Sequence, residues 1–150
     1  MRLTGTVTVL ACLAAVVLRA GGLQPAEERF GGRLSRMPVD LVTTHTVSGS
    51  GEVSATLDGG ELTIVATFAG VSSPANAAHV HRAPRARPGP VAFGVDVPRA
   101  DAGRIETTVA LTDEQVATLR RGHYYLQIHT EGNPGGELRG WLLPRPEPAP

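Results

Sequence analysis

Residues 51–68 read GEVSATLDGGELTIVATF, and this stretch decides the fold class. It contains two short runs typical of β-strands, Gly51–Leu57 and Glu61–Phe68, with Asp58-Gly59-Gly60 between them. Asp and Gly are favoured in tight turns between antiparallel strands, because these turns need backbone angles that other residues rarely adopt. The stretch therefore predicts two antiparallel strands joined by a short turn.

Further runs of the same kind follow along the chain, and turn residues separate nearly all of them. One such turn is Asn133-Pro134-Gly135-Gly136, and the whole chain holds 18 glycines and 12 prolines. Closely spaced strands separated by such turns predict an all-β domain, an antiparallel Greek-key β-sandwich or barrel. The further expected strands are Leu41–Val47, Ala77–His81, Val91–Val97, Arg104–Leu111, Tyr124–Thr130 and Glu137–Leu143.

One short helix is expected among the strands. Thr112 and Gln115 have the spacing of a capping box, in which each side chain accepts a hydrogen bond from the backbone N–H of the other residue. Val116 and Leu119 supply an apolar stripe, and Gly122 is a typical stop signal. We expect this helix to connect the two sheets.

Both ends of the chain are expected to lie outside the domain. Residues 1–22 combine Arg2, a nearly unbroken apolar run and small residues, which is typical of a secretory signal peptide. A retained membrane anchor is the alternative, although the run is shorter than the roughly 20 residues that span a bilayer. Residues 23–38 are interpreted as a flexible spacer, 39–144 as the domain and 145–150 as a proline-rich tail.

The single cysteine and the balanced charge exclude several classes of function. Cys12 lies within the expected signal, so the exported domain would have no thiol for a disulfide, a nucleophile or a zinc site. Basic and acidic residues number 14 each, so no overall field attracts nucleic acid. No glycine-rich loop leads into a helix to cradle phosphate, which argues against a nucleotide ligand.

The stretch Ala78-His79-Val80-His81 carries the first candidate chemistry. Successive side chains of a strand point to opposite faces, so Val80 enters the core while His79 and His81 face outward. Their Cα atoms would lie about 6.6 Å apart, a spacing at which two imidazoles can bind one metal ion. Two solvated surface histidines are the alternative interpretation.

A third outward histidine is expected on the strand Tyr124–Thr130. The apolar residues of this strand occupy alternate positions, so His129 faces away from the core, and Tyr125 and Gln127 share its face. These two neighbours either orient a ligand histidine through its second ring nitrogen or are ordinary exposed strand residues.

The last expected strand places a cation near this third histidine. Glu137, Arg139 and Trp141 are predicted to face outward, and a hairpin would put His129 beside Glu137 or Arg139. Arg139 would then attract a small anion toward a metal site. A surface ion pair between Arg139 and Glu137 is the alternative.

Several motifs of the chain occur together in one known family. They are SGSGEV at Ser48–Val53, AHVH at Ala78–His81, GPVAF at Gly89–Phe93, YLQIHT at Tyr125–Thr130 and NPGGELRG at Asn133–Gly140. In these motifs the chain resembles the CHRD (chordin) domain family over residues 39–143. The resemblance implies an extracellular domain, because CHRD units also form parts of larger secreted signalling proteins.

A fainter resemblance concerns residues 49–81, where a glycine-rich opening hairpin leads to the His-x-His motif. In this respect the chain is similar to the copper/zinc superoxide dismutases, which share an immunoglobulin-like antiparallel sandwich. The resemblance implies that His79, His81 and His129 bind copper and that Arg139 guides the superoxide anion.

The differences from that enzyme family restrict which metal ions the site could hold. Between His81 and His123 no histidine or aspartate cluster is available to build a zinc site, so the site would hold copper alone. The family's disulfide cysteines are missing and its long electrostatic loop is reduced to a short turn after His129, which argues against high turnover. Zinc is the main competitor for the copper ligands, since imidazole suits both metals.

The other basic residues have two interpretations each. His45, on the first expected strand, is either a fourth metal ligand or a polar surface residue. His123 follows the helix stop and is interpreted as a helix-end residue. The loop with Arg82, Arg85 and Arg87 either draws anions toward the site or is simply solvated.

Three functions stay open from the sequence. The first is an exported copper-binding protein with superoxide dismutase activity. The second is a non-catalytic module that binds an extracellular protein, and the third is a copper carrier or scavenger without turnover. The fold does not choose among them, because function belongs to the site.

Overall fold

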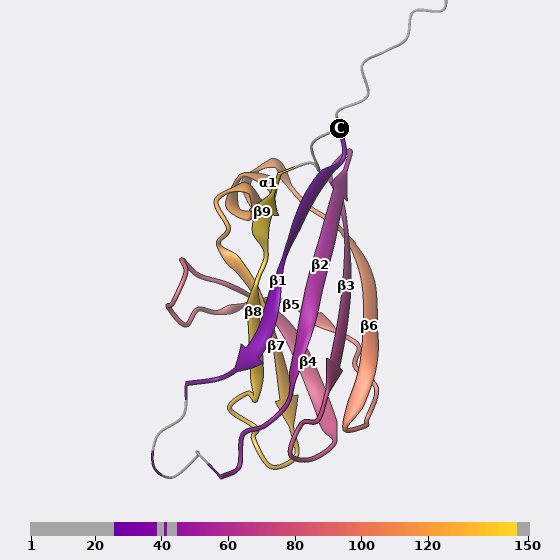
Figure 1. Ribbon diagram of the computed structural model, residues 1–150. Coiled ribbons are helices and arrows are strands. Elements are labelled where there is room, and N and C mark those ends of the chain that lie inside the picture. The colour runs from indigo at the N-terminus through magenta and orange to yellow at the C-terminus, as the bar shows by residue number, and fades with distance from the viewer. Residues whose placement is uncertain (1–25, 39–40, 42–44, 147–150) are drawn as a thin grey trace, which may run out of the picture.

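The computed structural model describes residues 26–38, 41 and 45–146 of the 150-residue chain. These residues form nine β-strands and one α-helix (Figure 1). The elements in chain order are β1 (Glu28–Arg36), β2 (Ser50–Asp58), β3 (Glu61–Ala69), β4 (Ala75–Arg82), β5 (Val91–Val95), β6 (Ala102–Ala110), α1 (Asp113–Arg120), β7 (Tyr124–Thr130), β8 (Leu138–Trp141) and β9 (Leu143–Arg145).

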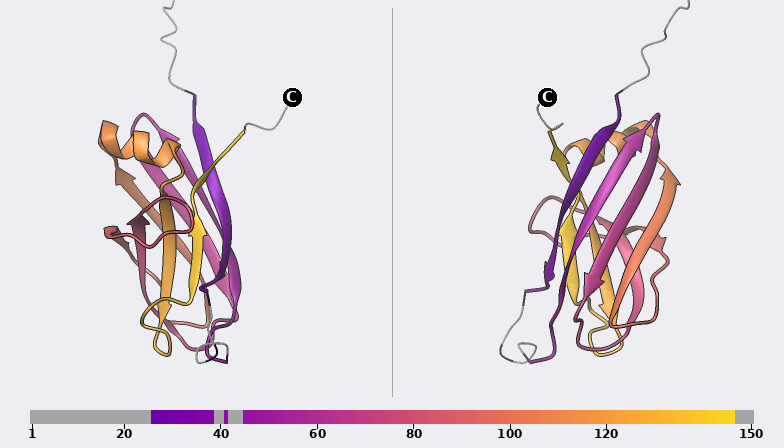
Figure 2. Two further views of the ribbon diagram at one scale, coloured as in Figure 1. Left: turned by 90° about the vertical axis from the view of Figure 1, so that its left-hand side faces the viewer. Right: turned by 45° about the vertical axis from the view of Figure 1, so that its right-hand side comes forward.

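The strand pairs of the described residues are all antiparallel and form one continuous path, β5-β4-β7-β8-β1-β2-β3-β6, with β9 beside β1. The path folds into two facing layers, with β2, β3 and β6 opposite β4, β5, β7 and β8 (Figure 2). The chain crosses between the layers after β3, after β5 and, through α1, after β6. The expected all-β Greek-key sandwich or barrel is confirmed, and the barrel is nearly closed.

The hydrophobic core lies between the two layers and is filled by alternate residues of each strand. On β3 every second residue from Leu62 to Phe68 is at most 3% exposed, and on β7 every second residue from Tyr124 to Ile128 is at most 1% exposed. Leu119 of α1 is 0% exposed and covers one end of this core. Burial of apolar surface is the main stabilising contribution in such a domain.

Strand β1 shows that the expected flexible spacer, residues 23–38, is wrong for most of its length. It pairs with β2 along Glu28–Leu34 and with β8 at Ser35–Arg36. β1 is therefore the strand that joins the two layers into one sheet. At the other end of the chain, β9 extends to Arg145, inside the expected tail of residues 145–150.

The pair Gly31-Gly32 explains why β1 was not recognised as a strand in the sequence. Phe30 and Leu34 are buried at 2% and 0% exposure, but the inward position between them carries no side chain. A Cβ on Gly32 would lie 2.4 Å from the carbonyl oxygen of Trp141, and one on Gly31 would lie 2.6 Å from a carbonyl oxygen of β2. The close approach of β1 to its neighbours requires glycine, and glycine removes the alternating pattern that reveals a strand.

The start of the expected domain also differs from the prediction. None of the described residues of the expected strand Leu41–Val47 lies in a strand, and Leu41, His45 and Thr46 lie in turns. The expected signal peptide, residues 1–22, lies outside the described residues. In the part of the chain that the structure describes, no helix is long and apolar enough to cross a membrane.

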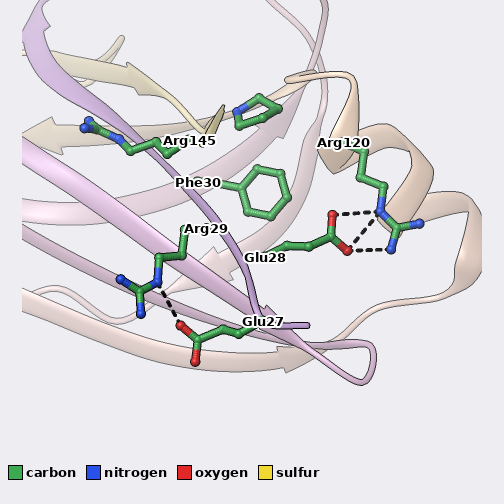
Figure 3. Close-up of a pocket in the computed structure, with 7 residues that line it drawn as sticks. Glu27, Glu28, Arg29, Phe30, Arg120 and Arg145 are labelled. Carbon is green, nitrogen blue, oxygen red and sulfur yellow. Dashed lines mark hydrogen bonds and ion pairs between the residues drawn. The ribbon is translucent and has the colours of Figure 1, made fainter. Parts of the chain in front are cut away.

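The capping box predicted for the helix is confirmed. The Thr112 hydroxyl accepts a hydrogen bond from the Gln115 N–H at 3.3 Å, and the Gln115 side chain accepts one from the Thr112 N–H at 2.8 Å. Near the end of α1, both Nε and an NH2 group of Arg120 donate to the carboxylate of Glu28 in β1 (Figure 3). Hydrogen bonding to Arg120 lowers the pKa of Glu28. This ion pair links the helix to the strand that joins the layers.

A buried carboxylate ties three loops together at the other end of the barrel. Glu137, predicted to face outward, is 0% exposed, because it precedes β8 and turns into the space between these loops. The loops are those before β2, before β4 and after β7. Its carboxylate accepts hydrogen bonds from the Ser48 N–H (2.9 Å), the Ser72 N–H (2.7 Å) and hydroxyl (2.9 Å), the Thr130 hydroxyl (2.6 Å) and the Asn133 amide (3.1 Å).

These hydrogen bonds make the charged form of Glu137 the stable one. Burial by itself raises the pKa of the carboxyl, but the hydrogen bonds from Thr130, Ser48 and Ser72 together lower it below its ordinary value of 4.5. A carboxyl whose pKa is depressed on folding stabilises the protein above its unfolded-state pKa. The contribution is lost as the pH falls through the folded-state pKa.

We expect Glu137→Gln to lower the free energy of unfolding by about 2–3 kcal/mol at neutral pH, since the new amide adds a donor among groups that already donate. Chemical denaturation measures this change. The exposed Glu61→Gln is the matched control and should alter stability by less than about 0.5 kcal/mol.

The pH dependence gives a second readout of the same carboxylate. The stability advantage of the wild type over Glu137→Gln should shrink as the pH is lowered below 4.5. An advantage that stays constant into the acid range would contradict the assignment of a charged, hydrogen-bonded Glu137.

Candidate metal centre

The pairing of β4 with β7 brings three histidines to one outer face of the barrel. In this antiparallel pair His81 lies opposite Tyr125, and His79 lies diagonally across from His129. Residues that lie opposite each other in a sheet point to the same face. Val80, between the two histidines of β4, is 0% exposed, so the three histidines occupy the face that points away from the core.

Three ring nitrogens, one from each of His79, His81 and His129, lie within 4.8 Å of one another. The closest pair is His79 Nδ1 and His129 Nε2, at 3.2 Å. The ring centroids of His79 and His81 are 5.9 Å apart, and all three side chains are half-buried. Among the described residues this is the one group of three histidine, cysteine or acidic side chains that is close enough to hold a metal ion.

Two backbone carbonyls determine which ring nitrogen of His81 and of His129 is free to bind a metal ion. His81 Nδ1 lies 2.9 Å from the carbonyl oxygen of Gly89, and His129 Nδ1 lies 2.9 Å from that of Pro134. A carbonyl oxygen only accepts hydrogen bonds, so each Nδ1 carries the proton and each Nε2 of the neutral ring keeps its lone pair. Metal-binding histidines are commonly oriented through their second nitrogen in this way.

The Nε2 atom of His81 is buried and has no hydrogen-bond partner among the described residues. Such an unsatisfied polar atom costs about 1–3 kcal/mol. A metal ion would satisfy it, so the residues present fit a bound metal. With metal–nitrogen bonds of about 2.0–2.1 Å, ligand nitrogens lie at most about 4.2 Å apart. Any separation between this limit and 4.8 Å has to close by small rotations of the rings.

The surroundings of His79 favour its neutral form. Burial lowers the pKa of His79, and positive charge on His129 or His81 lowers it further. Neutral imidazole is the form that binds metal ions. His79 is therefore held in the neutral state, which can donate a lone pair to a metal ion.

Buried side chains on the same face support the three rings. Tyr125 is 2% exposed, and its ring stacks on that of His81 with centroids 4.9 Å apart and planes 1° from parallel. The Tyr125 hydroxyl accepts a hydrogen bond from the Gly89 N–H at 3.2 Å, and Gln127 donates one to the Gly135 carbonyl at 2.9 Å. Tyr125 and Gln127 therefore hold the two loops that orient the histidines and are not ordinary exposed strand residues.

Arg139 lies on the same outer face, but β7 separates its strand β8 from β4. Its guanidinium carbon lies 4.6 Å from the centre of the Trp141 ring and 5.5 Å from that of the Tyr125 ring. The alternative of a surface ion pair with Glu137 is wrong, because that carboxylate is buried among the three loops.

The remaining sequence candidates lie outside the cluster. His45 is exposed in the turn before β2 and does not belong to the three histidines whose nitrogens converge. His123 follows α1, and its N–H donates to the Thr118 carbonyl at 3.2 Å, in agreement with a helix-end residue. Arg82, expected in a loop, is the last residue of β4 and forms an ion pair with Glu114 of α1.

Sequence reasoning missed the carbonyl groups of Gly89 and Pro134, which orient two of the rings. A backbone carbonyl is present in every residue, so no side-chain pattern marks these two. The only sequence signal is that each lies in a turn rich in Gly and Pro that follows a histidine strand.

Comparison with known proteins identifies the family. The model of the CHRD domain matches residues 35–142, more than two thirds of the chain. The matched segment includes β4, β7 and the loops that orient the histidines. No curated protein and no solved structure matches the chain, so the resemblance to copper/zinc superoxide dismutases gains no support from relatives. The match over residues 35–142 shows that this chain belongs to the CHRD domain family.

Proposed function

We propose that this chain is an exported copper-binding domain that disproportionates superoxide, with His79, His81 and His129 as the metal ligands. One observation carries the proposal: three ring nitrogens converge, and backbone carbonyls orient two of the rings. Histidines that merely face solvent do not leave a buried Nε2 without a partner.

The chemistry of the donor set supports copper. Imidazole suits copper, zinc, iron and nickel, and the affinities of divalent metals for such sites peak at copper. The converging group consists of three histidines and contains no carboxylate, which argues against magnesium or calcium. Three protein ligands leave a position open for a small molecule. Zinc competes for the same nitrogens.

Bound copper would supply one-electron chemistry, taking an electron from one superoxide anion, which leaves as dioxygen, and giving it to a second, which leaves as hydrogen peroxide after taking up two protons from water. The residues of the chain position the histidine rings that would bind the metal. The Gly89 and Pro134 carbonyls orient the His81 and His129 rings through Nδ1, and the stacked Tyr125 restricts His81 further.

The charge of Arg139 supports the proposal that the substrate is an anion. It forms no ion pair with any described residue, so its charge is not neutralised. Tyr125 contacts both Arg139 and His81 and lies on the strand between them, so Arg139 acts through its electric field. A field of this kind raises the local concentration of a small anion and is screened by salt.

The proposed export rests on the signal-peptide pattern of residues 1–22 and on the family, whose domains also occur in secreted proteins. Two competing functions remain, the first suggested by the family and the second by the histidine site. One is a non-catalytic module that binds an extracellular protein, and the other is a copper carrier without turnover. The experiments below separate the three.

The metal-free chain should bind one copper ion, and His129→Ala should weaken this binding by at least about 100-fold, because loss of an outer hydrogen-bond partner alone costs 10- to 100-fold. Isothermal titration with copper in a weakly chelating buffer measures both affinity and stoichiometry. His123→Ala removes a histidine outside the cluster and should bind copper as the wild type does.

Superoxide consumption by the copper-loaded chain then tests the activity. We expect activity in the wild type and in His123→Ala, and loss of activity in His129→Ala. Copper binding without superoxide consumption would refute the enzyme and leave the carrier. No metal uptake would refute both and leave the protein-binding module.

Removal of the charge at position 139 should act on the rate and not on the metal. We expect Arg139→Gln to lower the rate of superoxide consumption by about two- to tenfold at low ionic strength, with unchanged copper affinity. The difference from wild type should shrink as salt is added, and Arg139→Lys should retain most of the rate. A defect of equal size at every ionic strength would rule out the steering role.

A further inference from the structure

A groove lined by four arginines lies on the outer surface between β1, β8 and the loop after β4. Its volume is about 450 Å³, which is within the roughly 300–1,000 Å³ typical of small-molecule sites. Arg33 and Arg36 line it from β1, Arg139 from β8 and Arg85 from the loop. Four positive charges thus gather at one hollow of a chain whose net charge is zero.

The arginines of this groove lack the carboxylate partners that five other arginines of the chain have. At the hollow drawn in Figure 3, Arg29 and Arg120 are paired with glutamates, whereas Arg145 forms no ion pair with a described residue. In the groove, none of the four arginines forms an ion pair with a described residue, and none of the described residues that line the wall is acidic. Glu52 faces Arg33 across the β1–β2 pair but forms no ion pair with it.

The charged groups of the groove are all hydrogen-bond donors, because a guanidinium group only donates. The indole Nε1 of Trp141, which also lines the groove, is buried and has no acceptor among the described residues. Arg139 is held in place by packing on the Trp141 ring at 4.6 Å. Like charges that gather without a counter-charge repel one another, so an anion bound among them would be stabilising.

We infer that this groove binds a small ligand that carries two or more phosphate or sulfate groups. The planar fork of a guanidinium binds such a group through two parallel hydrogen bonds, which a lysine cannot do. A single monovalent anion would neutralise one of the four charges, whereas a ligand with several linked oxyanions would neutralise more of them. This site requires no metal ion, although it shares Arg139 with the proposed attraction of superoxide.

The position of the only tryptophan of the chain allows a direct test. Titration of the metal-free full chain with inorganic tripolyphosphate should change the fluorescence of Trp141 and saturate at one ligand per chain by calorimetry. A disulfated disaccharide, titrated in parallel, identifies the source, since the tighter probe shows whether phosphate or sulfate is preferred. The double variant Arg33→Gln/Arg36→Gln should weaken the binding of the tighter probe by at least about tenfold.

A matched control removes two positive charges outside the groove. Arg99→Gln/Arg104→Gln changes two exposed arginines outside the groove and should leave the affinity within about twofold of wild type. Equal weakening in the two double variants would overturn the inference in favour of general charge attraction. Absence of a saturable Trp141 response to both probes would also overturn it, and neither result bears on the copper site.

Discussion

The antiparallel register between β4 and β7 is the constraint on which the rest of this structure depends. Side chains alternate between the faces of a strand, so a slip of one residue would turn the histidines of the slipped strand into the core. Val80, Leu126 and Ile128, all 0% exposed, hold the register from the inner face. The packing that stabilises the barrel therefore also determines which three rings meet on its outer face.

Loops complete the site that the strands begin. The turn after β7 brings the Pro134 carbonyl to His129, and Asn133 in the same turn donates to the buried carboxylate of Glu137. That carboxylate also holds the loops before β2 and β4. A single charged group thus links the stability of one end of the barrel to the orientation of a candidate ligand, although it does not touch the ligand.

Local patterns in the sequence were enough to predict the strands from Gly51 onward and the outward direction of the three histidines, because strand alternation is a property of neighbouring residues. They did not reveal β1, because Gly31-Gly32 interrupts the alternation in order to let three strands come close. The carbonyl partners of His81 and His129 and the burial of Glu137 depend on loops that fold over residues distant in the sequence. No local pattern encodes such contacts.

The central claim is that three imidazoles from β4 and β7 bind one copper ion. Electron paramagnetic resonance of the copper(II)-loaded chain, with hyperfine couplings resolved for the ligand nitrogens, tests it most directly. We expect couplings from three imidazoles on a single copper centre. A spectrum with one imidazole or none, or with backbone amide nitrogens as the main ligands, would contradict it.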